Sequence, residues 1–320
     1  MKNEKQSQAF HDIFDGQFVV SAEIAGGKGE DSFCCSRAGN AALIGVFDGC
    51  GGLGARQYDH YEKHTGAYIA SRLASGAVYD WFRSGIHKGR HGDLTEKLRE
   101  RTAGALLLGE QKGGSALKLR GAMVRDFPTT AAIALAEYGN REITVQAVWA
   151  GDSRVYILNE NGLSPLSKDD THSRDAFEDL RDDPVQTNVL SSDGRYTLHT
   201  NHMRLQGPTA VVAATDGYFG YWRTPMHFEY FLLDTLRRSG SLSEWKEKLH
   251  SEIQDVTGDD ATMAVMLFSF GTFENLKQFY ADRCRELEQV YIQPLTDAYT
   301  EEKARTLWQD YRSGYERYLK

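Results

Sequence analysis

The sequence predicts an α+β fold built mainly from antiparallel strands. Short apolar segments bounded by turn residues indicate about nine strands. Several neighbouring segments are joined by only a few turn residues, as in hairpins, and the few long helical patterns do not alternate regularly with the strands. Because a doubly wound parallel sheet alternates strand and helix, this order favours an antiparallel architecture with helices on its faces.

Each predicted strand is a run of apolar, β-branched or aromatic residues. The runs cover residues 18–24, 32–36, 41–47, 129–138, 143–150, 154–158, 196–205, 210–215 and 262–268. The segment from Ile143 to Leu158 is a typical strand pair, because only a Gly-Asp-Ser turn separates its two halves.

Helices are predicted where apolar residues recur every three or four positions. These patterns cover residues 69–81, 94–119 and 230–253. A loop rich in glycine and basic residues separates the first two. The third pattern contains the sequence Arg-Arg-Ser-Gly-Ser, so we expect two helices that meet near Gly240.

Two further segments lie outside the sheets. Residues 167–195 are acidic and weakly periodic, which is typical of a surface flap beside a site. After Gly271, two apolar stripes on either side of Pro294 predict a pair of helices. The expected organisation is a main domain over residues 1–271 and a C-terminal helical extension over residues 272–320. We expect the extension to pack on the main domain, with contact to a partner or a second copy as the alternative.

Composition excludes several classes of protein. The 320 residues carry a net charge of −8 and are 41% hydrophobic and 26% charged, as in an ordinary globular protein. There is no basic block to bind nucleic acid and no apolar stretch long enough for export or membrane spanning, so we expect a cytoplasmic protein. The four cysteines lack zinc-site spacing and are expected to be free thiols.

Acidic residues recur at the ends of predicted strands. The four places are Glu30-Asp31, Asp48-Gly49, Asp216-Gly217 and Asp259-Asp260. Any one of them alone reads as a turn or a cap. Together, at the tips of strands of one sheet system, they would converge and repel one another unless cations bind. Because the ligands would be oxygens, Mg²⁺ or Mn²⁺ is the expected ion.

The order of these motifs resembles the type 2C family of metal-dependent serine/threonine protein phosphatases. The motifs are Glu30-Asp31, the turn FDGCGGLGA, the strand entry FPTTAAIAL, GDSR, Thr215-Asp216-Gly217 and Asp259-Asp260-Ala261-Thr262. The resemblance spans roughly residues 18–270. Each motif is weak alone, but their order and spacing make the set specific.

The resemblance implies a sandwich of two antiparallel sheets flanked by helices, in four α/β/β/α layers, with a site for two Mg²⁺ or Mn²⁺ ions at one end. The ligands it implies are Asp48 and the Gly49 carbonyl, then Asp216 and Asp259, with Glu30 and Asp31 acting mainly through water and Asp152 contacting a weaker third metal. Asp259 is chosen over Asp260 because it stands three residues before Thr262.

The implied reaction removes phosphate from phosphoserine or phosphothreonine in proteins. Hydroxide formed between the two metals would attack phosphorus without a covalent intermediate, with Asp48 and Asp216 as the catalytic residues.

The sequence departs from the family pattern at two positions. Relatives carry a phosphate-gripping arginine five residues before the position of Asp31, where this chain has Gly26. Lys28 is the nearest substitute for binding phosphate, although it is a point charge without the bidentate fork, and a solvated loop lysine is an equal alternative. Cys50 stands where many eukaryotic relatives have a histidine and bacterial relatives often have methionine.

Three other functions are open from the sequence. Gly26 and the helical extension leave room for a pseudophosphatase that acts as a binding module, and a small phosphorylated metabolite is a possible substrate. A cysteine phosphatase would use Cys50 with Arg56, but the spacing of the two differs from the usual phosphate-binding loop.

Overall fold

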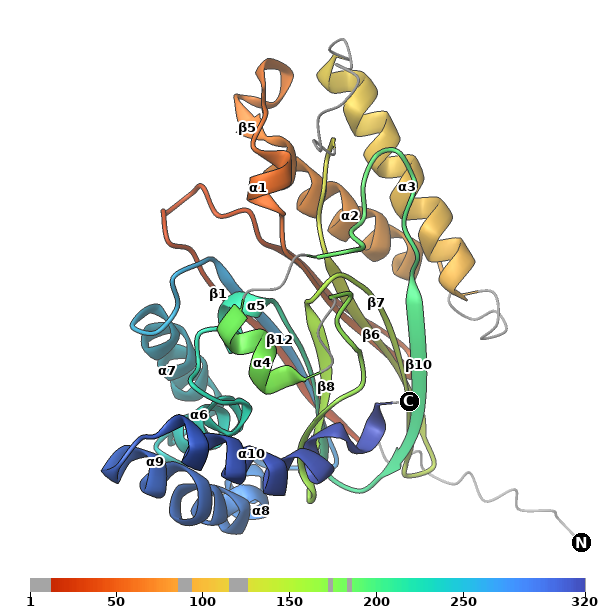
Figure 1. The fold of residues 1–320 in the computed structure, drawn as a ribbon. Coiled ribbons are helices and arrows are strands. Elements are labelled where there is room, and N and C mark those ends of the chain that lie inside the picture. Colours follow the sequence, from red (N-terminus) through yellow and green to blue (C-terminus); the bar gives the residue numbers. More distant parts are fainter. Residues whose placement is uncertain (1–12, 86–93, 115–125, 172–174, 183–185, 320) are drawn as a thin grey trace, which may run out of the picture.

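Two five-stranded antiparallel sheets are stacked face to face in a computed structural model that describes residues 13–85, 94–114, 126–171, 175–182 and 186–319 (Figure 1). The first sheet has the order β1 (Phe14–Ala22), β12 (Ala261–Phe268), β11 (Thr209–Ala214), β8 (Arg154–Asn159) and β9 (Gly162–Pro165). The second has the order β10 (His199–Gln206), β7 (Glu142–Ala150), β6 (Ala131–Gly139), β3 (Ala41–Phe47) and β2 (Ser32–Ala38). The predicted antiparallel sandwich is confirmed. The strand pair predicted from Ile143 to Leu158 is wrong, because the Gly-Asp-Ser turn leads from β7 in the second sheet to β8 in the first.

Small side chains fill the space between the two sheets. Ala42, Ala132 and Ala134 of the second sheet and Ala213 and Ala264 of the first belong to one buried cluster. Because both sheets are also covered on their outer faces, every residue of β3 and β12 is buried, which explains why these strands read as continuous apolar runs.

Two helices cover the outer face of the second sheet. They are α2 (Gly66–Arg83) and α3 (Leu94–Gly113). The Thr65 side chain begins α2 by accepting a hydrogen bond of 3.1 Å from the amide of Tyr68. Ile69 and Trp81, two of the residues in the predicted stripe, are buried in the cluster that joins α2 to this sheet. The predicted extension of α3 beyond residue 114 falls outside the described residues.

The outer face of the first sheet is covered by α6 (Pro225–Arg237) and α7 (Leu242–Gln254). They confirm two helices that meet near Gly240, where the Ser241 side chain caps α7 through the Glu244 amide. The first of them begins earlier than predicted because Pro225, which lacks an N–H, occupies its first turn.

The C-terminal helices pack beside α6 and share its apolar cluster. They are α8 (Phe273–Glu286), a π-helical turn (Leu287–Ile292), α9 (Gln293–Asp297) and α10 (Glu301–Tyr315), followed by a 3₁₀ turn (Glu316–Tyr318). The predicted separation at Pro294 is wrong. This proline lies in the first turn of α9, where its missing N–H costs nothing, and the helical path ends after Asp297.

Short elements connect the layers. They are α1 (Gly51–Gly54), β4 (Gln57–Tyr58), a 3₁₀ turn (Asp59–Tyr61), β5 (His64–Thr65), α4 (Ala176–Asp182) and α5 (Asp216–Phe219). Of the predicted flap over residues 167–195, the segments 172–174 and 183–185 fall outside the described residues. In the part of the chain that the structure covers, no helix is long and apolar enough to cross a membrane.

Candidate active site

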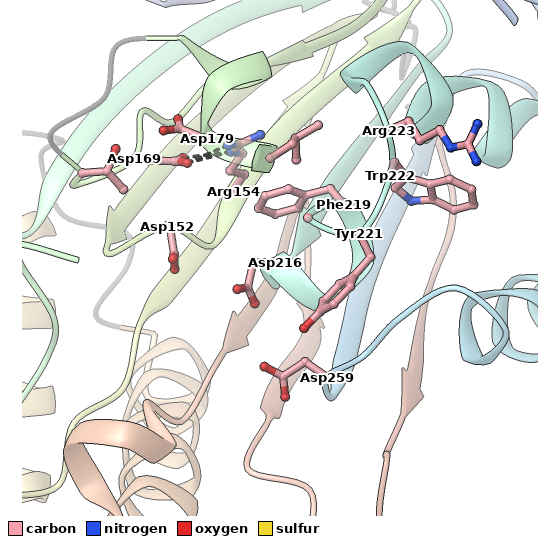
Figure 2. Close-up of a pocket in the computed structure, with 13 residues that line it drawn as sticks. Asp152, Arg154, Asp169, Asp179, Asp216, Phe219, Tyr221, Trp222, Arg223 and Asp259 are labelled. Carbon is pink, nitrogen blue, oxygen red and sulfur yellow. Dashed lines mark hydrogen bonds and ion pairs between the residues drawn. The ribbon is translucent and has the colours of Figure 1, made fainter. Parts of the chain in front are cut away.

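The sheet register brings the predicted acidic residues to one end of the sandwich. In the second sheet, Ser32 at the start of β2 pairs with Phe47 at the end of β3, so Asp31 and Asp48 are neighbours. In the first sheet, Ala214 at the end of β11 pairs with both Arg154 and Met263. Asp216, the Asp152 turn and Asp259 therefore meet at the same end, where Figure 2 shows their carboxylates beside one cavity.

Thr215 links the two sheets at this end. Its hydroxyl donates to Oδ2 of Asp31 at 2.9 Å and accepts from the amide of Thr262 at 2.9 Å. The side chain is fully buried, so water does not compete for these bonds. The threonine before Asp216-Gly217 thus orients one carboxylate and the start of β12.

Thr130, from the Thr-Thr pair before β6, makes a second link. Its hydroxyl accepts from the Asp48 amide at 3.2 Å and shares a hydrogen bond of 2.6 Å with the hydroxyl of Ser153. Its amide donates to the carbonyl of Asp48 at 2.8 Å. These bonds fix the Asp48 turn relative to the turn that carries Asp152.

Both Asp-Gly turns need glycine because there is no room for a Cβ atom. A Cβ atom on Gly49 would lie 2.7 Å from the carbonyl oxygen of Ala67. On Gly217 it would lie 2.0 Å from the carbonyl oxygen of Asp260. The glycines let the aspartates that precede them sit in close-packed turns.

The electrostatics of these carboxylates favour a bound cation. Burial raises the pKa values of Asp31, Asp48 and Asp152 well above their usual range, and repulsion from Asp216 raises all three further. Oδ1 of Asp31 and Oδ1 of Asp152 are buried without a hydrogen-bond partner. Orphaned carboxylate oxygens in a repulsive cluster fit a hard divalent cation.

The described residues do not form a closed metal cage. Among them, no three Asp, Glu, His or Cys side chains are gathered tightly enough to hold one ion by themselves. A cation bound here would therefore keep several water ligands, which is how Mg²⁺ binds to proteins.

Asp259 and Asp260 have different surroundings. Asp259 lines the cavity together with Asp216. Asp260 accepts backbone hydrogen bonds from Ile24 at 3.0 Å and from Glu30 at 2.7 Å, so it closes the loop before β2. The choice of Asp259 as the candidate ligand stays a prediction.

Glu30 lies beside Asp260 and Asp259. Burial raises its pKa, while a hydrogen bond from the Thr65 hydroxyl acts in the opposite direction. Its backbone carbonyl accepts from the Ser71 hydroxyl, which fixes the Glu30 loop on α2.

The cavity beside the carboxylates has a volume of about 440 Å³ (Figure 2). Asp152, Asp216 and Asp259 line one side, and the walls include Asp179 and Leu180 of α4, Phe219 at the end of α5 and residues 220–223 after it. Arg154 is buried in this wall and forms a bidentate ion pair with Asp169, at 2.6 Å for its closest contact.

Lys28 and Gly26 lie in an exposed turn. The Lys28 amide donates to the carbonyl of Ala25 at 2.9 Å, and a Cβ on Gly26 would meet open space. The backbone here therefore leaves room for a side chain at position 26, and the Lys28 side chain is exposed to solvent.

Two polar residues near the site were not predicted. Arg72 of α2 donates to the Gly29 carbonyl at 2.9 Å, and its positive charge acts on Glu30. Gln186, which lies in the predicted flap after α4, donates to Oδ2 of Asp152 at 2.6 Å and accepts from the Cys50 thiol at 3.5 Å. Neither belongs to a recognisable motif, so only the tertiary structure reveals them.

The alternative cysteine-phosphatase loop has a different geometry. Arg56 lies over the ring of Tyr58, 4.7 Å from its centroid, and the Cys50 thiol is turned toward Gln186. Burial raises the pKa values of Cys34 and Cys35, which are buried and half-buried free thiols of β2.

Comparison with known proteins assigns the fold to a family. The sheets, the carboxylate cluster and its cavity define the class of protein serine/threonine phosphatases. A sequence model described as protein phosphatase 2C matches residues 20–256, and the chain belongs to this family. No curated protein matches the sequence at a significant level.

Solved phosphatases have the same fold. Serine/threonine phosphatase Stp1 from Staphylococcus aureus superposes with a TM-score of 0.57 at 15% identity, covering 83% of this chain and 100% of its own. PppA from Pseudomonas aeruginosa, a regulatory component of its type VI secretion system, superposes with a TM-score of 0.55 at 20% identity. The match covers 80% of this chain and 97% of PppA. The catalytic domain of PstP in complex with two manganese ions superposes with a TM-score of 0.50 at 16% identity. The match covers 80% of this chain and 99% of the PstP domain.

Proposed function

We propose that this chain is a Mg²⁺- or Mn²⁺-dependent phosphatase that hydrolyses phosphoserine and phosphothreonine in proteins, and that it acts in the cytoplasm. One observation supports this most strongly. Asp31 and Asp152 each direct a buried, unpartnered carboxylate oxygen into a cluster whose other members repel them. Such a cluster is costly unless cations neutralise it.

The proposed ligands are those that the resemblance to the phosphatase family implies. Asp48, the carbonyl of Gly49, Asp216 and Asp259 would hold two cations directly, Glu30 and Asp31 would hold their water ligands, and Asp152 would contact a weaker third cation. When bound, two divalent cations lower the pKa of a water toward neutrality and neutralise charge on the phosphoryl oxygens.

The chain itself supplies orientation. Thr215 holds the Asp31 carboxylate and Thr130 holds the backbone of Asp48, so the Asp31 carboxylate and the Asp48 turn need not rearrange during the reaction. Lys28 would attract the substrate phosphate as an exposed point charge. This arrangement predicts weaker phosphate binding than a bidentate arginine would give.

Substrate class can be tested by rate comparison. Phosphate release is measured with Mn²⁺ on a phosphothreonine peptide and on a sugar phosphate of equal concentration. A higher kcat/KM on the peptide supports the protein phosphatase, whereas preference for the sugar phosphate would assign a metabolite phosphatase.

The pseudophosphatase is the second candidate, because Gly26 replaces the expected arginine. Calorimetric Mn²⁺ binding without hydrolysis of either substrate would favour it. Introducing the missing group with Gly26→Arg separates the two cases, since the open space at this position accommodates the side chain. A lowered KM in this variant is expected if the enzyme is active and Lys28 is a weak substitute.

A further inference from the structure

The C-terminal extension contacts α4, the short helix that lines the active-site cavity. The family match ends at residue 256, before α8, α9 and α10 begin. In Figure 1, α4 lies directly above α10, and hydrogen bonds join the two helices. These contacts join the extension to the matched part of the chain.

Asp175, the residue that starts α4, is held by α10 through both of its oxygens. Oδ1 accepts from the Phe177 amide at 2.9 Å, which caps α4. The same oxygen accepts from the indole N–H of Trp308 at 2.9 Å, and Oδ2 accepts from Arg312 at 2.8 Å. The start of α4 is therefore fixed by two residues of α10.

A third residue of α10 holds the first turn of α4. Arg305 forms an ion pair with Glu178, and its guanidinium lies 5.6 Å from the centroid of the Phe177 ring. Arg305, Trp308 and Arg312 are spaced by three and four residues, so they form one face of α10. This face is directed at α4.

The end of α10 touches the cavity wall from another side. The hydroxyl of Tyr315 accepts a hydrogen bond of 3.3 Å from Arg154, which holds Asp169 in its bidentate pair. Arg154 and Asp169 both line the cavity. Tyr315 and Arg154 are buried, so the contact is shielded from solvent.

The position of α4 determines the shape of the cavity. Asp179 and Leu180 of α4 form part of its wall, together with Phe219 and Trp222. A helix of seven residues is too short to be stable by itself, so tertiary contacts must set its position. Phe177 anchors one side of α4 in the core, and α10 supplies the polar contacts described above.

We propose that α10 is a positioning element for the active site: Arg305, Trp308, Arg312 and Tyr315 hold α4 and the Arg154–Asp169 pair, and thereby set the wall against which a phosphoprotein substrate binds. The proposal rests on the proposed phosphatase function for its kinetic consequence. Its structural part, the dependence of α4 on α10, does not.

The test compares an Arg305→Ala/Arg312→Ala variant with the wild type. Arg285→Ala is the matched control, because Arg285 also lies in the extension but pairs only with Asp282 of its own helix α8 at 2.9 Å among the described contacts. Amide hydrogen exchange in residues 175–182 reports the position of α4. KM and kcat on a phosphothreonine peptide and on p-nitrophenyl phosphate show whether the cavity wall still binds substrate in the same way.

We expect exchange in residues 175–182 to be about tenfold faster in the double variant, since two charged contacts are lost. KM for the peptide should rise about fivefold, more than KM for p-nitrophenyl phosphate, which is too small to span the cavity. Lysine in place of alanine at position 312, Arg312→Lys, should restore part of the slow exchange and of the low peptide KM. Arg285→Ala should match the wild type in every readout.

Unchanged exchange in residues 175–182 would overturn the proposal, as would faster exchange with an unchanged peptide KM in an active enzyme. If the double variant fails to fold, Trp308→Phe replaces it, because it keeps an aromatic ring in the buried position and removes only the N–H donated to Asp175. If the wild type hydrolyses nothing, the proposed function fails and the exchange measurement alone decides the role of α10.

Discussion

The hydroxyl of Thr215 donates a hydrogen bond of 2.9 Å to Oδ2 of Asp31, although the two residues are 184 positions apart in the sequence. The bond joins the end of β11 in one sheet to the start of β2 in the other. One oxygen of the Asp31 carboxylate is thereby fixed, and the other remains buried without a partner. The carboxylate is thus held in an orientation that a cation would stabilise.

Thr215→Val should remove the hydrogen bond that orients the Asp31 carboxylate while keeping the shape of the side chain at position 215. The Thr262 amide loses its acceptor as well, so we expect the free energy of unfolding to fall by about 2 kcal/mol. Urea unfolding measures the change, and Mn²⁺ calorimetry should show weaker binding. Thr306→Val, on the exposed face of α10, is the control. Equal stability and Mn²⁺ affinity in Thr215→Val and the wild type would contradict this role.

Removing one charge from the cluster should stabilise the metal-free protein. Repulsion from Asp216 contributes to the raised pKa values of Asp31, Asp48 and Asp152. Asp216→Asn therefore removes this repulsion from all three carboxylates. In excess chelator we expect the free energy of unfolding at pH 7 to increase by about 1 kcal/mol. Mn²⁺ should raise the melting temperature of the wild type and leave the variant unchanged. Asp282→Asn, an exposed charge on α8, should alter neither quantity.

His227 should make stability fall in mild acid. Burial lowers its pKa from 6.5 to about 4, and its Nδ1 shares a hydrogen bond of 2.7 Å with Thr224. Above pH 6.5 the imidazole is neutral in both the folded and the unfolded chain, so it does not lower the free energy of unfolding. As the pH falls from 6.5 toward 4, the unfolded chain gains a proton that the folded chain does not, so stability is lost over this range.

The matched variant is His227→Asn, whose amide replaces Nδ1 without titrating. The wild type should lose about 3 kcal/mol more than the variant between pH 7 and pH 4. Chemical unfolding at several pH values measures the difference. Parallel pH profiles for the two proteins would show that His227 does not contribute.

Glu229 should be essential for the packing of the extension. It is fully buried, accepts two hydrogen bonds of 2.8 and 2.9 Å from Arg283 of α8, and accepts another from the hydroxyl of Tyr311 of α10. Glu229→Ala leaves Arg283 without this partner in a mostly buried place, so we expect a loss of about 3 to 5 kcal/mol.

Thermal or urea unfolding measures this loss. Glu286→Gln is the control, because Glu286 is an exposed partner of the same arginine and should cost about 1 kcal/mol or less. Similar stabilities for the two variants would show that the buried pair is not what holds α8 and α10 to α6.

The sequence was informative where the pattern was local. Alternating or continuous apolar runs located most strands, and β3 matched its predicted bounds because turn residues stand at both ends. Boundaries shifted where tertiary pairing decides. The strand predicted to start at Thr129 begins at Ala131, since Thr129 pairs instead with Gly49 and Leu190. The short strands β4, β5 and β9 carry too few residues to give a pattern.

The carboxylates of the candidate site could be predicted because each stands at a strand end, and antiparallel pairing gathers those ends. Their roles as metal ligands stay a prediction. The contacts of Arg72, Gln186 and Asp175 could not be predicted, because each joins segments far apart in the chain through a polar side chain without a motif. The helix that continues through Pro294 likewise depends on a π-helical turn that periodicity does not indicate.

The central claim is that this carboxylate cluster binds divalent cations and uses them to hydrolyse phosphate esters. The most direct test measures p-nitrophenyl phosphate hydrolysis with Mn²⁺, with excess chelator, and with Asp216→Asn. We predict turnover with Mn²⁺ that chelator abolishes and that falls by at least about 100-fold in the variant. Turnover that persists in chelator, or a fully active Asp216→Asn enzyme, would contradict the account.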